Sequence, residues 1–228
     1  MMYRLRIWIL LIFAATLSLQ SCFEIREVVT FQRDGSGTFS LSIDLSQVKQ
    51  MIQGFGQQEN AANGSPFQNM EAEYDKTREK LEKVDGVSKM RFISENDGYV
   101  ITTGFEFSDV AALNRGMDVV YENESETGNV PEYYKFNRRN FERTASHNFL
   151  DLVKNEFAGS DMGVEGMDLS TLFSNVAYVN EIHFEDREVR RVRSGNVEVS
   201  DDGTMVTNRY LIFNETADQQ LEFRLRVK

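Results

Sequence analysis

The chain has 228 residues, of which 36 are acidic and 25 are basic, and its formal net charge at pH 7 is −11. This balance argues against a nucleic-acid partner, because phosphates are bound by Lys and Arg. It also argues against broad electrostatic adhesion to anionic lipid headgroups. Aromatic residues make up 11% of the chain and there are only 2 Pro, which is typical of a globular protein rather than a disordered one.

The start of the chain has the pattern of an export signal. Arg4 and Arg6 form a short basic segment, and residues 7–19 that follow are uncharged and mostly apolar. This apolar run is shorter than the roughly 20 residues that a membrane-spanning helix needs. The pattern therefore predicts a secretory signal peptide.

The end of this signal contains a motif that points to lipid attachment. Leu19-Gln20-Ser21-Cys22 resembles the lipobox of bacterial lipoproteins, although Gln20 stands where a small or apolar residue is usual. The resemblance implies that residues 1–21 are removed and that Cys22 then carries a diacylglycerol on its sulfur and an acylated amine, such as a palmitoyl amide. Cys22 is the only cysteine, so no internal disulfide can form.

Attachment through Cys22 would be stable, because two or three acyl chains hold a protein on a membrane whereas one binds only marginally. Two alternatives stay open, namely a cleaved secretory signal with an incidental cysteine and an uncleaved signal anchor. No Ser/Gly tether follows Cys22, so we expect the folded part to lie close to the membrane. The absence of Asp after Cys22 favours the outer membrane, facing the periplasm.

The first half of the mature chain alternates between hairpin and helix patterns. Two hairpins are expected at 23–45 and 87–107, each around an Asp-Gly turn and each with one apolar face. Helices are expected from the cap Ser46, over 67–84, and from the cap Ser108. This order suggests a repeated ββα unit, which either a duplication or shared turn and cap chemistry explains.

The second half of the chain is predicted to be richer in strands. A short hairpin is expected around residues 137–140, a helix after Ser146, and strands over much of 176–228, with a turn at Asp201-Asp202-Gly203. Segments 54–66 and 158–170 have the composition of loops, with binding loops as the alternative. The expected fold is α+β, with antiparallel hairpins or a sheet and several packed helices.

No Pro/Gly-rich linker divides the mature chain. We therefore expect one domain over 22–228, with 158–170 as the place where a subdivision would fall. The layout resembles the LppM-like family of bacterial lipoprotein domains. The resemblance lies in Cys22 followed directly by a strand, in Asp34-Gly35-Ser36-Gly37-Thr38, and in the turn at 201–204 before a late strand. It implies contact with lipids or glycolipids of the cell envelope.

A search for catalytic or metal-binding patterns finds none that is specific. The two histidines, His147 and His183, lack the three or four ligands at workable spacing that zinc needs. The acidic residues at 122–126 and 201–202 do not match a calcium-binding loop. No phosphate-binding glycine loop or nucleophile motif is present. We therefore predict no catalytic residue, no metal site and no cofactor.

One basic cluster stands out in this acidic chain. It contains Arg190, Arg191 and Arg193, and on a regular strand Arg191 and Arg193 would share a face opposite Arg190. These residues could contact a lipid phosphate or an acidic partner. The alternative, which we favour from sequence, is pairing with acidic residues of the same chain.

Two functional hypotheses follow. The first is a membrane-anchored envelope lipoprotein that acts as a non-enzymatic binding or scaffolding module for a protein, a lipid or a glycan. The second is an envelope hydrolase that uses carboxylates outside any recognisable motif. A pocket that gathers acids or a histidine with shifted pKa values would favour the hydrolase.

Overall fold

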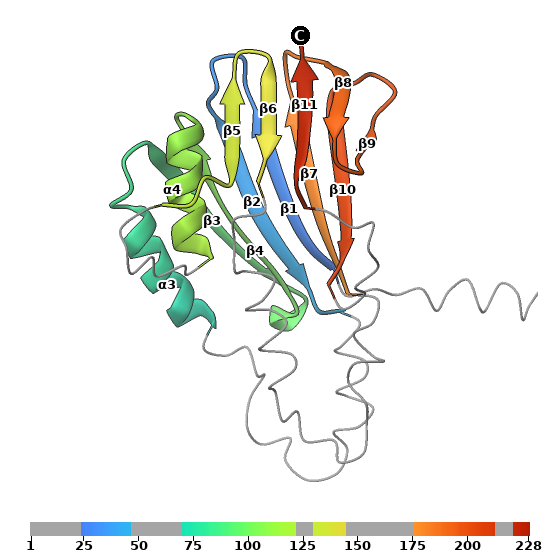
Figure 1. Ribbon diagram of the computed structural model, residues 1–228. Helices are drawn as coiled ribbons and strands as arrows, with labels where there is room; N and C mark the ends of the chain where they lie inside the picture. Colours follow the sequence, from blue (N-terminus) through green and yellow to red (C-terminus); the bar gives the residue numbers. More distant parts are fainter. Residues whose placement is uncertain (1–23, 47–69, 122–129, 145–175, 213–220) are drawn as a thin grey trace, which may run out of the picture.

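The computed structural model describes residues 24–46, 70–121, 130–144, 176–212 and 221–228 (Figure 1). The larger of its two sheets has seven strands, in the spatial order β3-β4-β2-β1-β7-β10-β9. The strands of this sheet are β1 Glu24–Phe31, β2 Gly37–Asp44, β3 Val87–Glu95, β4 Val100–Phe107, β7 Ala177–Phe184, β9 Glu198–Val199 and β10 Met205–Leu211.

The smaller sheet has four strands, in the order β5-β6-β11-β8. Its strands are β5 Tyr134–Asn137, β6 Asn140–Arg143, β8 Val189–Ser194 and β11 Phe223–Val227. The described α-helices are α3 Met70–Leu81 and α4 Val110–Val120, and a short 3₁₀ turn, η1 Asn96–Gly98, joins β3 to β4. The small sheet and α4 lie side by side over one face of the large sheet (Figure 1).

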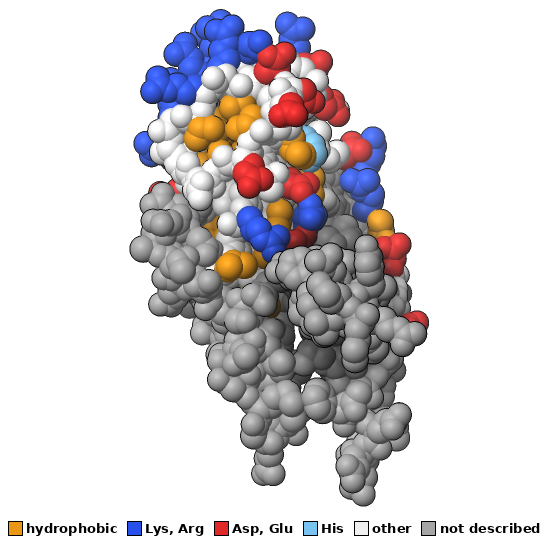
Figure 2. All heavy atoms as spheres, turned by 90° about the vertical axis from the view of Figure 1, so that its right-hand side faces the viewer, with side chains coloured by type: hydrophobic (Ala, Val, Ile, Leu, Met, Phe, Trp, Pro, Cys, Tyr) orange, Lys and Arg blue, Asp and Glu red, His pale blue; other side chains and the backbone are white. Residues whose placement is uncertain are grey.

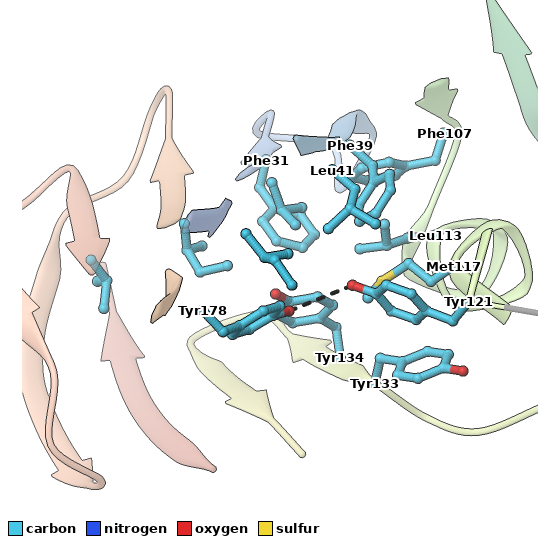
Figure 3. Close-up of a cluster of buried hydrophobic side chains, with 14 of the residues drawn as sticks. Phe31, Phe39, Leu41, Phe107, Leu113, Met117, Tyr121, Tyr133, Tyr134 and Tyr178 are labelled. Atoms are coloured by element: carbon cyan, nitrogen blue, oxygen red, sulfur yellow. Dashed lines mark hydrogen bonds between the residues drawn. The ribbon is translucent and has the colours of Figure 1, made fainter. Parts of the chain in front are cut away.

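The hydrophobic core fills the space between these layers. On β1 every second side chain is buried, from Ile25 to Phe31, as expected for a strand with one face on a core. Phe31 lies in a cluster of aromatic rings from both sheets, with Phe141 and Phe184 at centroid distances of 5.4 and 6.1 Å. Figure 3 shows Phe31 among other buried side chains, with Tyr121, Tyr133, Tyr134 and Tyr178 nearby. The two sheets therefore share one continuous core.

The expected α+β class with several packed helices is wrong for the described residues, which hold eleven strands and two α-helices. The expected antiparallel sheet also needs correction, because β1 and β7 pair in parallel, with Glu24 opposite Ala177 and Phe31 opposite Phe184. Turn signals reveal pairing between neighbouring strands. They carry no information about two strands that lie far apart in the chain, so the parallel pair and the second sheet were missed.

The predictions that concern neighbouring segments of the chain are confirmed for three hairpins and two helices. The three expected hairpins are confirmed as β1–β2, β3–β4 and β5–β6, all antiparallel. The helix expected over 67–84 is confirmed as α3. The helix expected after Ser108 is confirmed as α4, but its N-cap is Asp109, whose carboxylate accepts a 2.8 Å hydrogen bond from the Ala112 N–H.

Several predictions fall outside the described residues. They are the helices after Ser46 and Ser146 and the loops 54–66 and 158–170. Within the described part of the chain, neither helix is both long and apolar enough to cross a membrane.

Candidate functional site

The predicted lipidation site lies just before the described part of the chain. Cys22 is outside the described residues, and β1 starts two residues later at Glu24. Two residues of extended chain span at most about 7 Å. If Cys22 is lipidated, the Glu24 end of β1 is therefore held close to the membrane.

The most unusual polar group in the core is Glu27 on β1. Its carboxylate accepts hydrogen bonds from Tyr121, which follows α4, from Tyr134 on β5, and from Tyr178 on β7. The Asn180 amide donates a further bond of 2.6 Å. The guanidinium of Arg143 on β6 lies 3.5 Å from the carboxylate, and both side chains are fully buried. This cluster links the two sheets and the end of α4. Figure 3 shows its three tyrosines, Tyr121, Tyr134 and Tyr178.

The protonation states follow from this arrangement. Burial alone would raise the pKa of Glu27, but the charge of Arg143 and the three tyrosine hydroxyls outweigh burial and lower that pKa. Burial and the neighbouring carboxylate raise the pKa of Tyr121, Tyr134 and Tyr178 well above the ordinary value of 10. Glu27 is therefore a carboxylate at neutral pH, and the tyrosines stay protonated as its donors.

This cluster does not have the properties of an active site. Glu27 and Arg143 are fully buried, so a substrate could not reach them. In the described ranges, no group of three or more His, Cys, Asp or Glu residues is placed to hold a metal ion. Nothing in this part of the chain favours the hydrolase hypothesis.

The described histidine belongs to a ladder of charged residues on the opposite face of the large sheet. His183 Nε2 lies 3.6 Å from Oε2 of Glu181, two residues earlier on the same face of β7. Glu181 also pairs with Arg26, while Glu24 pairs with Arg26 and, at 3.1 Å, with Arg209. These contacts explain the residues as a network of ion pairs on a sheet face. His147 lies outside the described residues.

The acidic pair Asp201 and Asp202 forms a turn. The Asp202 carboxylate accepts hydrogen bonds from the Ser200 hydroxyl at 2.6 Å and the Thr204 N–H at 3.0 Å. The bond from Ser200 contributes most to lowering the pKa of Asp202 to about 2. The Asp202 carboxylate therefore stabilises the β9–β10 turn. The other acidic stretch, 122–126, lies outside the described residues.

The three predicted arginines lie on the outer face of the small sheet, facing away from the core. Arg190, Arg191 and Arg193 on β8 are all exposed, and Arg224 and Arg226 on the neighbouring β11 are exposed beside them. We call these five residues the arginine face. Figure 2 shows Lys and Arg side chains gathered at the top of the view.

Irregular pairing brings the β8 arginines to one side. Leu225 pairs with Val192 and Val227 pairs with Val189, and both valines pack against the core. Val189 and Val192 are three positions apart, whereas residues of a regular strand that point the same way are separated by an even number of positions. A β-bulge therefore lies between the two valines. Arg190 and Arg191 are consequently both on the outer side. The regular alternation that placed Arg190 on the opposite face is not observed.

Most charges of the arginine face have no ion-pair partner among the described residues. Arg224 makes a 2.9 Å ion pair with Glu142, whereas Arg190, Arg191, Arg193 and Arg226 form no ion pair with any described residue. The predicted pairing of the β8 arginines with acidic residues is thus not seen in the described part of the chain.

A shallow depression of about 440 Å3 lies on the same surface. Arg193 and Arg224 line it, together with Lys135, Asn137, Asn140 and Glu142. We did not predict Arg224 and Arg226 as part of the site, although the sequence pattern of the last strand indicates their position. Arg224, Arg226 and Lys228 alternate with the apolar residues of the last strand, so they had to share one exposed face.

No family model matches the chain, and no curated protein matches it. Among solved structures, the chain is similar to the folded domain of LppM from Mycobacterium tuberculosis, with 11% identity and a TM-score of 0.38, over 90% of this chain and 89% of that one. The function of this chain is therefore inferred from its own residues.

The buried pair yields a prediction about stability. Glu27→Gln leaves the Arg143 charge without a counter-ion in the core, so we expect a loss of about 3–5 kcal/mol in the free energy of unfolding. The double variant Glu27→Gln/Arg143→Met should lose clearly less than the sum of its two single variants. Denaturant titration of all three variants measures this coupling.

An exposed pair serves as the control for that experiment. Glu142→Gln breaks the ion pair with Arg224 on the surface, and we expect a change within about 1 kcal/mol. Additive losses in the double variant would contradict the proposed coupling between Glu27 and Arg143.

The lowered pKa of Glu27 predicts acid sensitivity. A group whose pKa is lower in the folded state stabilises the fold fully above its ordinary pKa of 4.5, and this contribution is lost as the pH falls through the folded-state value. We expect the free energy of unfolding to fall below pH 4.5, and to fall less steeply in Glu27→Gln/Arg143→Met. Identical pH profiles for the two proteins would show that Glu27 does not contribute.

Proposed function

We propose that this protein is a lipid-anchored envelope lipoprotein whose folded part is a non-enzymatic binding module. In this proposal acylated Cys22 holds the protein on the outer membrane, facing the periplasm. The arginine face is then the surface that binds the ligand. The basic start, the short apolar run and the lipobox-like motif support the anchor.

The observation that carries the binding role is the arginine face itself. A chain with 36 acidic residues has ample acids to neutralise five arginines, yet four of the five have no ion pair among the described residues. Guanidinium groups bind carboxylates and phosphates through two parallel hydrogen bonds. Exposed arginines on a rigid sheet are therefore suited to an anionic partner.

The anchor predicts covalent lipid attachment at one residue. Cells that express the protein and are fed a fatty-acid analogue should label the natural chain, and Cys22→Ala should abolish the label. The unlabelled variant should keep residues 1–21, because the lipobox-like motif that marks the cleavage point then lacks its cysteine. Equal label in both proteins would refute the anchor.

The binding role predicts a contact in intact cells. A photo-crosslinking residue in place of Ser194, which is exposed beside Arg224, should give a defined adduct. The same residue in place of Glu198, which is exposed on the large sheet, should not. Changing Arg191 and Arg226 to Gln should remove the Ser194 adduct. Equal crosslinking from both positions would contradict a specific binding face.

A further inference from the structure

The strand register defines two ends of the fold. At one end Glu24 lies opposite Asp44 and Ala177, and at the other end Phe31 lies opposite Gly37 and Phe184. The seven steps between Glu24 and Phe31 cover about 23 Å at the usual rise of a strand. The proposed anchor at Cys22 belongs to the Glu24 end, because only Phe23 separates the two residues.

The small sheet is fixed to the Phe31 end. The Arg187 guanidinium donates hydrogen bonds to the carbonyls of Arg33, after β1, and Arg138, in the β5–β6 turn. The Val227 N–H, at the end of β11, donates to the carbonyl of Arg139 in the same turn at 2.9 Å. The β5–β6 turn, the start of β8 and the end of β11 thus meet at the end of the fold remote from Glu24 (Figure 1).

Further basic groups extend the arginine face at this end. Arg33, Arg138 and Arg139 are exposed there, and so is Lys228, which pairs with Glu188. Two acids lie within this surface as ion-pair partners, Glu142 with Arg224 and Glu188 with Lys228. The exposed acids Glu185 and Asp186 follow β7 at the same end, and Figure 2 shows acidic side chains next to the basic ones. The chain as a whole is strongly acidic, but the outer face of the small sheet is mostly basic, with Glu142 as the acid that pairs with an arginine there.

Two features of this surface cost stability. Arg191 and Arg226 are direct partners across β8 and β11, and like charges in that arrangement destabilise a sheet. Arg138 has a φ of 49°, a left-handed conformation that Gly or Asn adopts at lower cost. Departures from local rules of this kind are expected at functional sites.

Protection of an exposed sheet edge does not explain why arginines cover this face of the small sheet. β-Bulges and charges on an edge strand prevent pairing with other molecules, and β8 is such a strand. β11, however, lies inside the sheet between β6 and β8, and it carries Arg224 and Arg226 on the same face. The arginine face therefore needs another explanation.

The geometry favours phosphate as the bound group. Arg191 and Arg226 lie on adjacent strands and can approach one anion from two directions. The oxygens of a phosphate do not lie in one plane, so guanidinium groups from two strands can each bind it through two hydrogen bonds, whereas the two coplanar oxygens of a carboxylate accept one such bidentate contact along their edge. Arg193, Arg224, Lys135 and the amide-bearing Asn137 and Asn140 line the depression nearby, which offers a place for a second group.

Building on the proposed function, we propose that the arginine face binds successive phosphate groups of an extended polymer of the cell envelope. The bound polymer lies at the end of the fold remote from Cys22. The protein would thus connect the membrane that carries its lipid to a phosphate-bearing polymer beyond it. The headgroups of the anchoring membrane are the competing ligand, which the experiment separates.

The test uses the full lipidated protein in phosphatidylcholine nanodiscs, with fluorescent linear polyphosphate as the probe. Anisotropy should show saturable binding that weakens with salt, and polyglutamate of equal charge should compete poorly. Arg191→Gln/Arg226→Gln should bind about tenfold or more weakly, with a salt slope smaller by about 1.4, the value for two lost phosphate contacts. Lys80→Gln/Lys83→Gln removes the same charge from exposed positions at the end of α3 and should bind as the natural protein does.

Arg138→Asn separates binding from folding. Asn tolerates the left-handed conformation, and the hydrogen bond from Arg187 is accepted by the backbone carbonyl, which this substitution leaves in place. We expect an unchanged or higher melting temperature together with weaker polyphosphate binding. A lower melting temperature with unchanged binding would show that Arg138 serves the fold alone.

Besides a failure of polyphosphate to bind, three results would overturn the proposal. They are equal binding by the arginine and lysine double variants, equal affinity for polyglutamate, and loss of polyphosphate binding when the nanodiscs contain phosphatidylglycerol. The last result would identify the lipids of the anchoring membrane as the ligand. If polyphosphate fails to bind while the Ser194 crosslink still forms in cells, the binding module stands and the phosphate-polymer inference falls.

Discussion

The fold depends on a carboxylate that has no access to water. Glu27 sits in the middle of β1, and its partners come from β5, β6, β7 and the segment after α4. Burying both Glu27 and Arg143 is costly, and the cost is offset only when every partner is in place. The cluster therefore specifies how the small sheet sits on the large one. An apolar core alone would allow the two layers to slide or rotate, because hydrophobic contact is non-directional.

The elements that could be predicted from sequence are those formed by residues close together in the chain. Asp34-Gly35 and Asp97-Gly98 lie between strands of alternating pattern, and both hairpins formed as expected. The pairing of β1 with β7 and of β11 with β6 and β8 has no such local signal. In the sequence, Glu27 interrupts an apolar stripe formed by Ile25, Val29 and Phe31. Its role could not be inferred, because the five side chains around it come from four distant segments.

The same limit applies to the arginine face. The β8 arginines stood out as a cluster, but a regular strand would have divided them between two faces. The bulges that bring Arg190 to the side of Arg191 depend on the pairing of Leu225 and Val227 with the two valines of β8. The partner arginines on β11 lie some thirty residues later in the chain. The cluster was therefore recognised as basic, while its extent and its outward orientation required the structure.

The parallel pairing of β1 with β7 has a consequence for how the protein matures. The two strands lie at the centre of the large sheet, yet most of the chain separates them. The small sheet likewise remains open until β11 inserts between β6 and β8. Chains whose core contacts are so distant in sequence fold slowly, because a long loop must close before those contacts form. In the proposed exported lipoprotein, slow folding of this kind would leave time for the polypeptide to pass through a translocation pore while it is still extended.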